Sequence, residues 1–414
     1  MAVSALIRSV MTGVLAGSAL VLGVVAAADP ARAESIRVLV GQDVALLTVR
    51  SEGDVAVITE TGDTKVLHPP LQVSARKEGL EVNGRHLSGG YILIRPVMSQ
   101  LSLKMSKEEG QRSGNGGFTG SAQGAELSVS GALRILHKGR LLSAVNQLDL
   151  EEYVKGVVPS EVNSAWHPEM LKVQAVAART YALYNKMLSG GREYDVVATT
   201  QDQVYRGRSG VDRRVEEAVE STRGIVVTYQ RAPIYAAFSS TAAGPTEDAV
   251  NVWANKDLPY LKGVECPFDL DSPYYQWKAN VKVEQLEQSL RRQGFSIGTV
   301  ATITPILYSR AGRVARLRIL HSNGETVLRG EDLRKAVGYT VIPSTQFEVE
   351  SMGAEVVFTG YGAGHAVGLC QWGAKELAEL GYSYDSILQY YYPGTELHQV
   401  ASTQVLAPPT LPAP

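Results

Sequence analysis

Glu161 is the residue whose sequence context best suits acid chemistry. It lies in the stretch YVKGVVPSEVNSAWHPEMLKVQAVAARTYALY, residues 153–184. Residues 153–158 are apolar and rich in β-branched side chains, which predicts the end of a strand. Pro159 and Ser160 then interrupt that strand, so Glu161 is expected on a turn.

A long helix is expected directly after this turn. His167 and Pro168 predict its start, because a proline at an early helical position sacrifices no hydrogen bond. Residues 169–187 contain no Gly or Pro, and helix formers dominate them. A strand that leads to Glu161 and a helix that braces it would hold the carboxyl group in a partly dry place. Its pKa would then rise and it could donate a proton near neutral pH; a solvent-exposed loop glutamate is the alternative.

Further polar side chains with suitable chemistry follow along the chain. Arg179 lies on the expected helix, where it could hold the carboxylate or N-acetyl groups of a sugar. Gln203 and Tyr205 follow a predicted strand, and amides and phenols suit sugar recognition because they combine directional hydrogen bonds with an apolar face. A structural role, such as a tyrosine that anchors a turn or an arginine on a solvated face, is the alternative for each.

Two later stretches are rich in small residues. The stretch FSSTAAGPTEDA places Ser239 and Ser240 on a turn where a polymer could approach the backbone closely. The Gly-dense stretch GYGAGHAVGLCQWGA contains His365 and Gln371, for which substrate contact and a purely structural role are both open.

Three blocks of this sequence together resemble the family of sporulation stage II protein D (SpoIID) and the LytB amidase enhancers, which act on peptidoglycan. The blocks are residues 153–184, 238–277 and 360–397, in the order found in the family. The segments GRVARLRIL and PSTQFEV between the second and third blocks are also similar. The resemblance runs from about residue 126 to residue 397. It implies an α+β fold: a strand-rich catalytic domain with a long helix after the catalytic turn.

The resemblance implies a lytic transglycosylase that needs no cofactor. Glu161 would be the general acid that protonates the glycosidic oxygen between N-acetylmuramic acid (MurNAc) and N-acetylglucosamine (GlcNAc). The C6 hydroxyl of the muramic acid would then close on C1 and give a 1,6-anhydro end. The substrate would be peptidoglycan glycan strands, and a cell-wall amidase is a further partner that the family suggests. The alternative is a non-enzymatic, wall-binding activator of an N-acetylmuramoyl-L-alanine amidase.

We expect no metal. Some family members carry Cys and His near the second-block turn, where zinc could bind, but this chain has neither between residues 238 and 264. Its two cysteines, Cys266 and Cys370, fall short of the four closely spaced ligands of a structural zinc site. They could form a disulfide that closes a loop of about 100 residues, worth roughly 4 to 5 kcal/mol, or remain free thiols. A thiol hydrolase that uses Cys370 with His365 is a further alternative.

Composition and the N-terminus bear on the location of the protein. A net charge of −2 and a pI near 6.4 in 414 residues indicate no nucleic-acid binding. Residues 1–33 read as a signal peptide, with Arg8, an uncharged apolar stretch and the cleavage pattern Ala31-Arg32-Ala33. We therefore expect secretion to the periplasm or cell wall. Contact with the membrane would arise only if this segment remained uncleaved as an anchor.

The remaining sequence suggests three regions. Residues 34–124 alternate short β-branched runs with turn residues and end in a polar, Gly-rich linker, which predicts a small N-terminal β region. Residues 125–397 form the expected catalytic domain. Residues 398–414, rich in Pro, Ala and Thr, are expected to be a disordered tail.

Overall fold

The computed structural model describes residues 34–97, 100–107 and 126–400. The predicted signal peptide, most of the predicted linker and most of the predicted tail lie outside these residues. Helices and strands mix in several sheets, which confirms the α+β prediction. Among the described residues, no helix is both long enough and apolar enough to cross a membrane.

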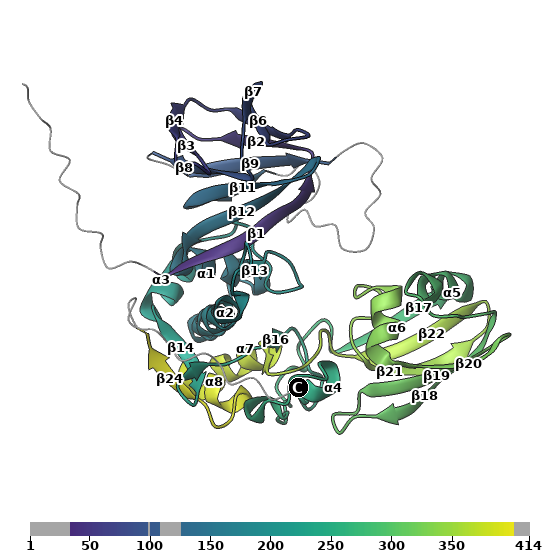
Figure 1. The fold of residues 1–414 in the computed structure, drawn as a ribbon. Coiled ribbons are helices and arrows are strands. Elements are labelled where there is room, and N and C mark those ends of the chain that lie inside the picture. The colour runs from purple at the N-terminus through teal and green to yellow at the C-terminus, as the bar shows by residue number, and fades with distance from the viewer. Residues whose placement is uncertain (1–33, 98–99, 108–125, 401–414) are drawn as a thin grey trace, which may run out of the picture.

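Two β-sheets pack against each other at one end of the molecule (Figure 1). In spatial order, the larger sheet contains β13 (Val196–Val197), β1 (Ser35–Val44), β12 (Leu141–Asp149), β11 (Ala132–Lys138), β8 (Tyr91–Pro96), β3 (Val55–Thr59) and β4 (Thr64–Leu67). The smaller contains β10 (Leu127–Val129), β9 (Leu101–Ser106), β2 (Leu46–Arg50), β5 (Leu71–Ala75), β6 (Leu80–Val82) and β7 (Arg85–Leu87). Each sheet contains strands from before and after residue 124. The predicted N-terminal region (34–124) and the predicted catalytic domain (125–397) therefore share both sheets.

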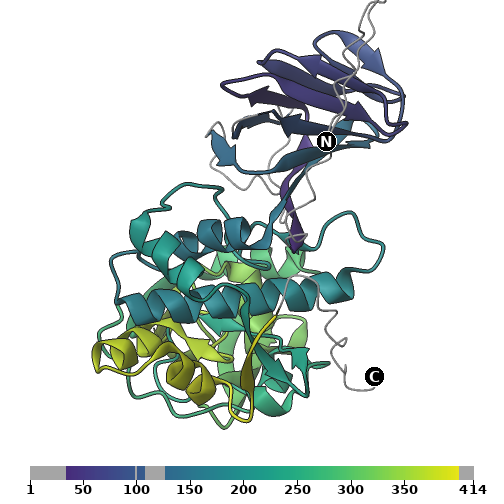
Figure 2. The same cartoon turned by 90° about the vertical axis from the view of Figure 1, so that its left-hand side faces the viewer.

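The helical body follows these sheets and shares their hydrophobic core. Figure 2 shows β-strands running from the sheets down into this body. Its helices are α1 (Leu150–Glu161), α2 (Pro168–Ser189), α3 (Arg213–Ser221), α4 (Ala249–Val252), a 3₁₀ turn (Pro259–Leu261), α7 (Gln371–Glu379) and α8 (Tyr384–Tyr391). Its short strands are β14 (Ile225–Tyr229), β15 (Ala232–Pro233), β24 (Glu396–Gln399), β16 (Phe238–Ser239) and β23 (Leu369–Cys370).

A second lobe between residues 276 and 361 has a hydrophobic core of its own. One three-stranded sheet contains β17 (Gln276–Lys282), β22 (Glu355–Tyr361) and β21 (Gln346–Met352), and the other contains β18 (Val300–Tyr308), β19 (Val314–His321) and β20 (Gly324–Arg329). The helices α5 (Val283–Arg292) and α6 (Gly330–Val337) complete it (Figure 1). The sequence analysis did not separate this lobe from the rest of residues 125–397.

The segment before Glu161 is a helix, so the predicted strand is wrong. Asp149 caps α1 by accepting hydrogen bonds from the backbone N–H groups of Glu151 and Glu152 at 2.8 and 3.2 Å. The buried apolar residues of α1 include those at positions 150, 153, 154, 157 and 158, which is the spacing of one helical face. The cap and this buried face outweigh the β-propensity of the valines.

Helix α2 begins as predicted, with His167 as its N-cap and Pro168 in its first turn. It is buried along most of its length and contacts α1, α3, α7, α8 and β14. Four alanines on this helix, at positions 175, 177, 178 and 182, are fully buried. Their small side chains allow the neighbouring elements to approach α2 closely.

A buried ion pair fixes α1 on α2. Nε and Nη2 of Arg179 donate to the two carboxylate oxygens of Glu151 at 2.8 and 2.6 Å. Arg179 also donates to the backbone oxygen of Ile225 at 3.0 Å, and Glu151 accepts from the backbone N–H of Gly224 at 3.1 Å. Because Arg179 is completely buried and used in this way, the prediction that it lines a sugar-binding groove is wrong.

We predict that Arg179→Leu lowers the free energy of unfolding by about 3 to 5 kcal/mol, because it leaves the Glu151 carboxylate buried without its partner. Urea denaturation of the two proteins measures the difference. The matched control is Lys172→Gln on the same helix, which breaks a partly exposed pair with Glu169 and should cost less than about 1 kcal/mol. Equal losses for the two variants would contradict this role of Arg179.

Candidate active site

Glu161 is the last residue of α1, and its half-buried side chain is held by a loop. Its Oε1 accepts a hydrogen bond from the backbone N–H of Val204 at 2.6 Å. Burial raises the pKa of Glu161 to about 7, while the Val204 N–H and the charge of Arg206 act in the opposite direction. The position at a helix C-terminus also disfavours a negative charge, because the helix dipole is negative there. The carboxyl group can therefore both hold and release a proton near neutral pH.

The loop that contains Val204 is fixed on both sides. Asp202 accepts from the hydroxyl of Tyr181 at 2.9 Å and from the backbone N–H of Val197 at 2.8 Å. These bonds tie the start of the loop to α2 and to β13. The position of the Val204 N–H is therefore determined by the helical body rather than by the loop alone.

Gln203 and Tyr205, predicted as substrate contacts, are buried anchors of the same loop. The Oε1 atom of Gln203 accepts from the hydroxyl of Tyr153 on α1 at 3.1 Å. The hydroxyl of Tyr205 donates to Oδ1 of Asn146 on β12 at 2.9 Å. With their polar groups turned into the protein, these side chains do not reach a glycan, and we correct their role to that of positioning Val204.

Gly156 allows this loop to lie directly on α1. A Cβ atom at this position would be 2.3 Å from the carbonyl oxygen of Gly207 and 2.5 Å from the ring of Tyr205. Neither the backbone oxygen nor a buried ring can move aside easily. The absence of a side chain at Gly156 is therefore required for the contact between Val204 and Glu161.

The third block reaches the same site through the start of α7. Nε2 of Gln371 lies 3.5 Å from the backbone oxygen of Glu161 and 3.2 Å from Oε1 of Gln174 on α2. Gln371 therefore contacts the backbone of Glu161 through an amide that is almost completely buried, and substrate contact by this residue stays a prediction. The Nε2 atom of Gln174 is buried and has no hydrogen-bond partner in the described part of the chain.

The second block joins the third at the neighbouring tryptophan. The backbone N–H of Trp372 donates to the backbone oxygen of Ser240 at 3.1 Å. The Trp372 ring meets the ring of Trp166, which follows Glu161 by five residues, edge to face at 5.0 Å. Ser240 thus lies close to the Glu161 region through its backbone, and its Oγ atom contacts the hydroxyl of Thr241 at 3.2 Å.

Ser239 and His365 have internal partners. Oγ of Ser239 accepts from the backbone N–H of Ala366 at 3.1 Å, and Nδ1 of His365 accepts from the backbone N–H of Val367 at 2.9 Å. The imidazole also packs against the Trp253 ring at 4.9 Å. Burial, together with the charges of two arginines, lowers the pKa of His365 to about 3, so the ring is neutral at physiological pH. These contacts indicate that both residues shape the second-block turn.

Cys370 is placed unfavourably for a nucleophile. Its side chain is 1% exposed, and its Sγ atom contacts Oδ2 of Asp269 at 3.2 Å. Burial first, and the neighbouring Cys266 second, raise the pKa of the Cys370 thiol well above its usual range. Since a catalytic cysteine needs an accessible thiolate and a base, this geometry speaks against the thiol-hydrolase alternative.

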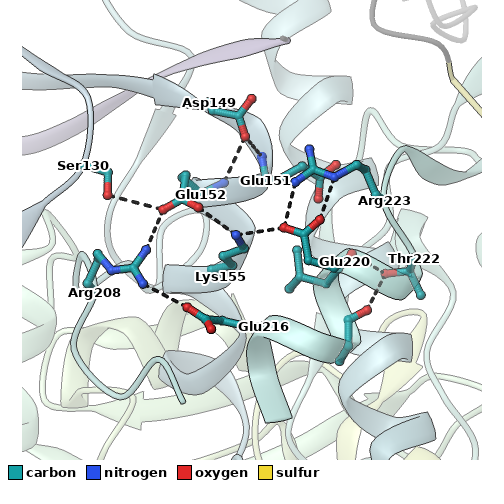
Figure 3. Close-up of polar contacts among 12 residues, drawn as sticks. Ser130, Asp149, Glu151, Glu152, Lys155, Arg208, Glu216, Glu220, Thr222 and Arg223 are labelled. Atoms are coloured by element: carbon teal, nitrogen blue, oxygen red, sulfur yellow. Dashed lines mark hydrogen bonds and ion pairs between the residues drawn. The ribbon is translucent and has the colours of Figure 1, made fainter. Parts of the chain in front are cut away.

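Four other carboxylates from this part of the chain, at positions 152, 169, 202 and 247, already have partners. Glu152 pairs with Lys155 and Arg208 at the start of α1, in the polar network of Figure 3. Glu169 pairs with Lys172 and accepts from the backbone N–H of Tyr384. Asp202 is used by the loop described above. Glu247 is buried and accepts from Asn251, from its neighbour's backbone N–H and from Ser309.

The predicted site residues did not include the Val204 N–H, which bonds to the Glu161 carboxyl group, or Gln174, Trp166 and Trp372, which are linked to the site through Gln371. The sequence cannot point to a particular backbone N–H donor, because every residue except proline has one. The two tryptophans did carry a signal, because each lies within a few residues of a predicted site residue and tryptophans are scarce in this chain. Gln174 could have been found as a polar residue on the Ala-rich helix.

The chain is similar to known proteins over most of its length. A family model described as stage II sporulation protein matches residues 138–229, which contain α1, α2 and the Val204 loop. A model of a domain of unknown function matches residues 267–368, which include the second lobe.

Curated relatives extend this similarity. Stage II sporulation protein D of Bacillus subtilis is 31% identical over 327 residues, covering 74% of this chain and 92% of the relative. An uncharacterized protein of Brachyspira hyodysenteriae is 31% identical over 310 residues, covering 73% of this chain and 82% of the relative. The amidase enhancer of Bacillus subtilis is 32% identical over 289 residues, which is 59% of this chain and 40% of that relative.

The raised pKa of Glu161 makes folding stability depend on pH. Below about pH 4.5 the carboxyl group is protonated in both the folded and unfolded states and contributes nothing. Between about pH 4.5 and 7 the unfolded chain releases this proton while the folded protein keeps it, so wild-type stability falls. We therefore expect Glu161→Gln to gain up to about 3 kcal/mol relative to wild type across this window, at about 1.4 kcal/mol per pKa unit.

Denaturation at several pH values measures this difference. The control Asn163→Ala changes a neutral residue two positions further on, and its effect should not vary with pH. A difference between wild type and Glu161→Gln that stays constant from pH 4 to 8, or that changes in the opposite direction, would show that the Glu161 pKa is not raised.

Proposed function

Since the chain belongs to the family of stage II sporulation protein D, we propose that it is a peptidoglycan lytic transglycosylase with Glu161 as its general acid. The observation that supports this most strongly is the half-buried Glu161 carboxyl group with a pKa of about 7. A protonated carboxyl group of this kind can deliver a proton to a leaving oxygen near neutral pH.

The reaction needs one acid and no water. Glu161 donates its proton to the glycosidic oxygen between MurNAc and GlcNAc, and the bond from that oxygen to C1 breaks. The C6 hydroxyl of the same muramic acid attacks C1, and its proton returns to Glu161. The product is a 1,6-anhydro-MurNAc end. Hydrolases that use two carboxylates would need a second free acid, and the neighbouring carboxylates described above are already paired.

The Val204 N–H has a defined part in this cycle. After proton donation, Glu161 is a carboxylate, and the hydrogen bond from Val204 together with the charge of Arg206 stabilises it. Burial favours the protonated form before donation. The two opposing effects keep both states close in free energy, so the group can give and regain a proton in one turnover.

Side chains near the end of α1 that are still partly exposed are candidates for substrate binding. We propose the Trp166–Trp372 pair, because partly exposed indole rings suit the apolar faces of a sugar. The substrate lies in the bacterial cell wall, so we also propose that the protein acts outside the cytoplasm after loss of residues 1–33.

A non-enzymatic role is a second candidate, favoured by one observation. A relative with 32% identity is named an amidase enhancer. In that role the chain would bind glycan strands and stimulate a cell-wall amidase, and Glu161 would not need to transfer a proton.

Digestion of purified glycan strands distinguishes the two roles. We expect wild-type protein to release fragments with the mass of anhydro-MurNAc ends, and Glu161→Gln to be slower by at least about 10²-fold, because it removes the donated proton while keeping the side-chain shape. Pelleting with insoluble peptidoglycan and thermal unfolding should show that the variant still binds and folds.

The matched control is Glu169→Gln, a nearby glutamate in the first turn of α2, which should cleave like wild type. If Glu161→Gln cleaves glycan strands as fast as wild type, Glu161 is not the general acid. If wild-type protein releases no fragments but stimulates an amidase, and Glu161→Gln does so equally well, the enhancer role replaces the enzymatic one.

A further inference from the structure

Three potential metal ligands from distant parts of the chain meet behind the second-block turn. Cys266 and Asp269 lie in the loop that leads to the second lobe, and Cys370 lies at the start of α7. One ligand atom from each residue falls within 4.8 Å of the other two, and all three residues are buried. The two cysteines carry free thiols.

Hydrogen-bond donors lie beside both sulfur atoms. The Sγ atom of Cys370 accepts from the backbone N–H groups of Ala242 at 3.3 Å and Gly373 at 3.4 Å. Cys370 is the N-cap of α7, where the helix dipole favours negative charge. The Sγ atom of Cys266 lies 3.2 Å from the hydroxyl of Tyr391.

Asp269 supplies an independent indication of a ligand. Its Oδ2 atom accepts from the backbone N–H groups of Ala242 and Ala243, both at 2.8 Å. Its Oδ1 atom is buried and has no hydrogen-bond partner among the described residues. A buried carboxylate oxygen without a hydrogen bond lowers the stability of the fold, because burial removes its bonds to water and no protein donor replaces them.

Gly373 keeps the space beside the sulfur atoms open. A Cβ atom at this position would be 2.3 Å from the Tyr391 hydroxyl, 2.6 Å from Sγ of Cys266 and 3.5 Å from Sγ of Cys370. The helix can therefore start directly against the cluster only because residue 373 has no side chain.

The sequence analysis expected no metal because it considered only the two cysteines; with Asp269 beside them, we propose that Cys266, Asp269 and Cys370 bind one zinc ion. Two thiolates and one carboxylate are common zinc ligands, and Zn–S bonds of about 2.3 Å in a tetrahedral site place neighbouring ligand atoms within the spacing found here. Both thiols release their protons to solvent when the metal binds. The fourth position is left for water or for the Tyr391 hydroxyl.

Charge balance supports a divalent cation. Three anionic ligands would repel one another in a buried site, and one divalent cation reduces their total charge from −3 to −1. The guanidinium group of Arg313 is 2% exposed and interacts electrostatically with Cys370 and Asp269, so it offsets the remaining charge. Its Nε and Nη1 atoms have no hydrogen-bond partner in the described ranges, which leaves the charge available to the cluster.

The role of this zinc is structural. Cys266 precedes β17 and Cys370 follows β22, and both belong to the core of the helical body, so a metal between them ties together the two chain segments that connect this body to the second lobe. Gln371, which contacts the backbone of Glu161, directly follows Cys370. The metal therefore holds the start of α7 in position for the active site. A disulfide would join the same two residues but would leave Oδ1 of Asp269 without a partner.

Metal analysis of the full chain, purified in the presence of a reductant and without chelators, tests this proposal. We expect elemental mass spectrometry to find about one zinc per chain in the wild type, and less than about a tenth of that in Cys266→Ser and Cys370→Ser. Asp269→Asn can still accept from the Ala242 and Ala243 N–H groups, so it should fold but bind zinc at least about tenfold more weakly. The control Ser272→Ala changes a buried residue in the same turn and should retain the metal.

Cobalt substitution gives a second readout, because thiolate ligands add a charge-transfer absorption to bound Co²⁺. We expect this band in wild type and in Ser272→Ala but not in the cysteine variants. Protein without stoichiometric zinc and without a cobalt–thiolate band would overturn the proposal. The intact mass of protein isolated without reductant gives a further test. If that protein contains no metal and its mass is lower by two hydrogens, Cys266 and Cys370 form a disulfide, and the zinc proposal is overturned.

Discussion

The buried pair between Arg179 and Glu151 is the interaction on which the arrangement of the candidate active site depends. It fixes the start of α1 on the middle of α2, and through Ile225 and Gly224 it also binds the start of β14. Because α1 is a helix that ends at Glu161, fixing its beginning also fixes the direction in which the Glu161 carboxyl group points. A buried charge pair of this kind is expensive to assemble, but it admits only one relative position of the two helices.

The loop around Val204 then sets the chemistry of the carboxyl group. Its anchors come from α1, α2 and β12, so the Val204 N–H is brought to Glu161 by the same core that places the helix. Burial and the helix C-terminus favour the protonated acid, and the Val204 N–H and Arg206 favour the carboxylate. This balance, rather than a second acid, is what a single-carboxylate mechanism requires.

The sequence predicted the features that depend on local pattern. His167 and Pro168 marked the start of α2, and the alternating runs of the N-terminal region predicted its strands. The segment 153–158 was misread because its valines favour strands, while the deciding influences were the Asp149 cap and burial against α2.

Arg179, Gln203 and Tyr205 were chosen correctly as unusual polar residues but given the wrong role. Their partners lie at least 28 positions away, so only the fold shows that their polar groups point inward. Asp269 could not be linked to the two cysteines from sequence for the same reason.

In the proposed reaction Glu161 transfers a proton, and the C6 hydroxyl of the substrate rather than water attacks C1. Digestion of glycan strands in ¹⁸O-labelled water, followed by mass spectrometry of the new sugar ends, tests this most directly. The proposed mechanism predicts anhydro-MurNAc ends that contain no ¹⁸O. Reducing ends that carry the label would mean hydrolysis, and would contradict the lone-acid mechanism even if Glu161 proved essential.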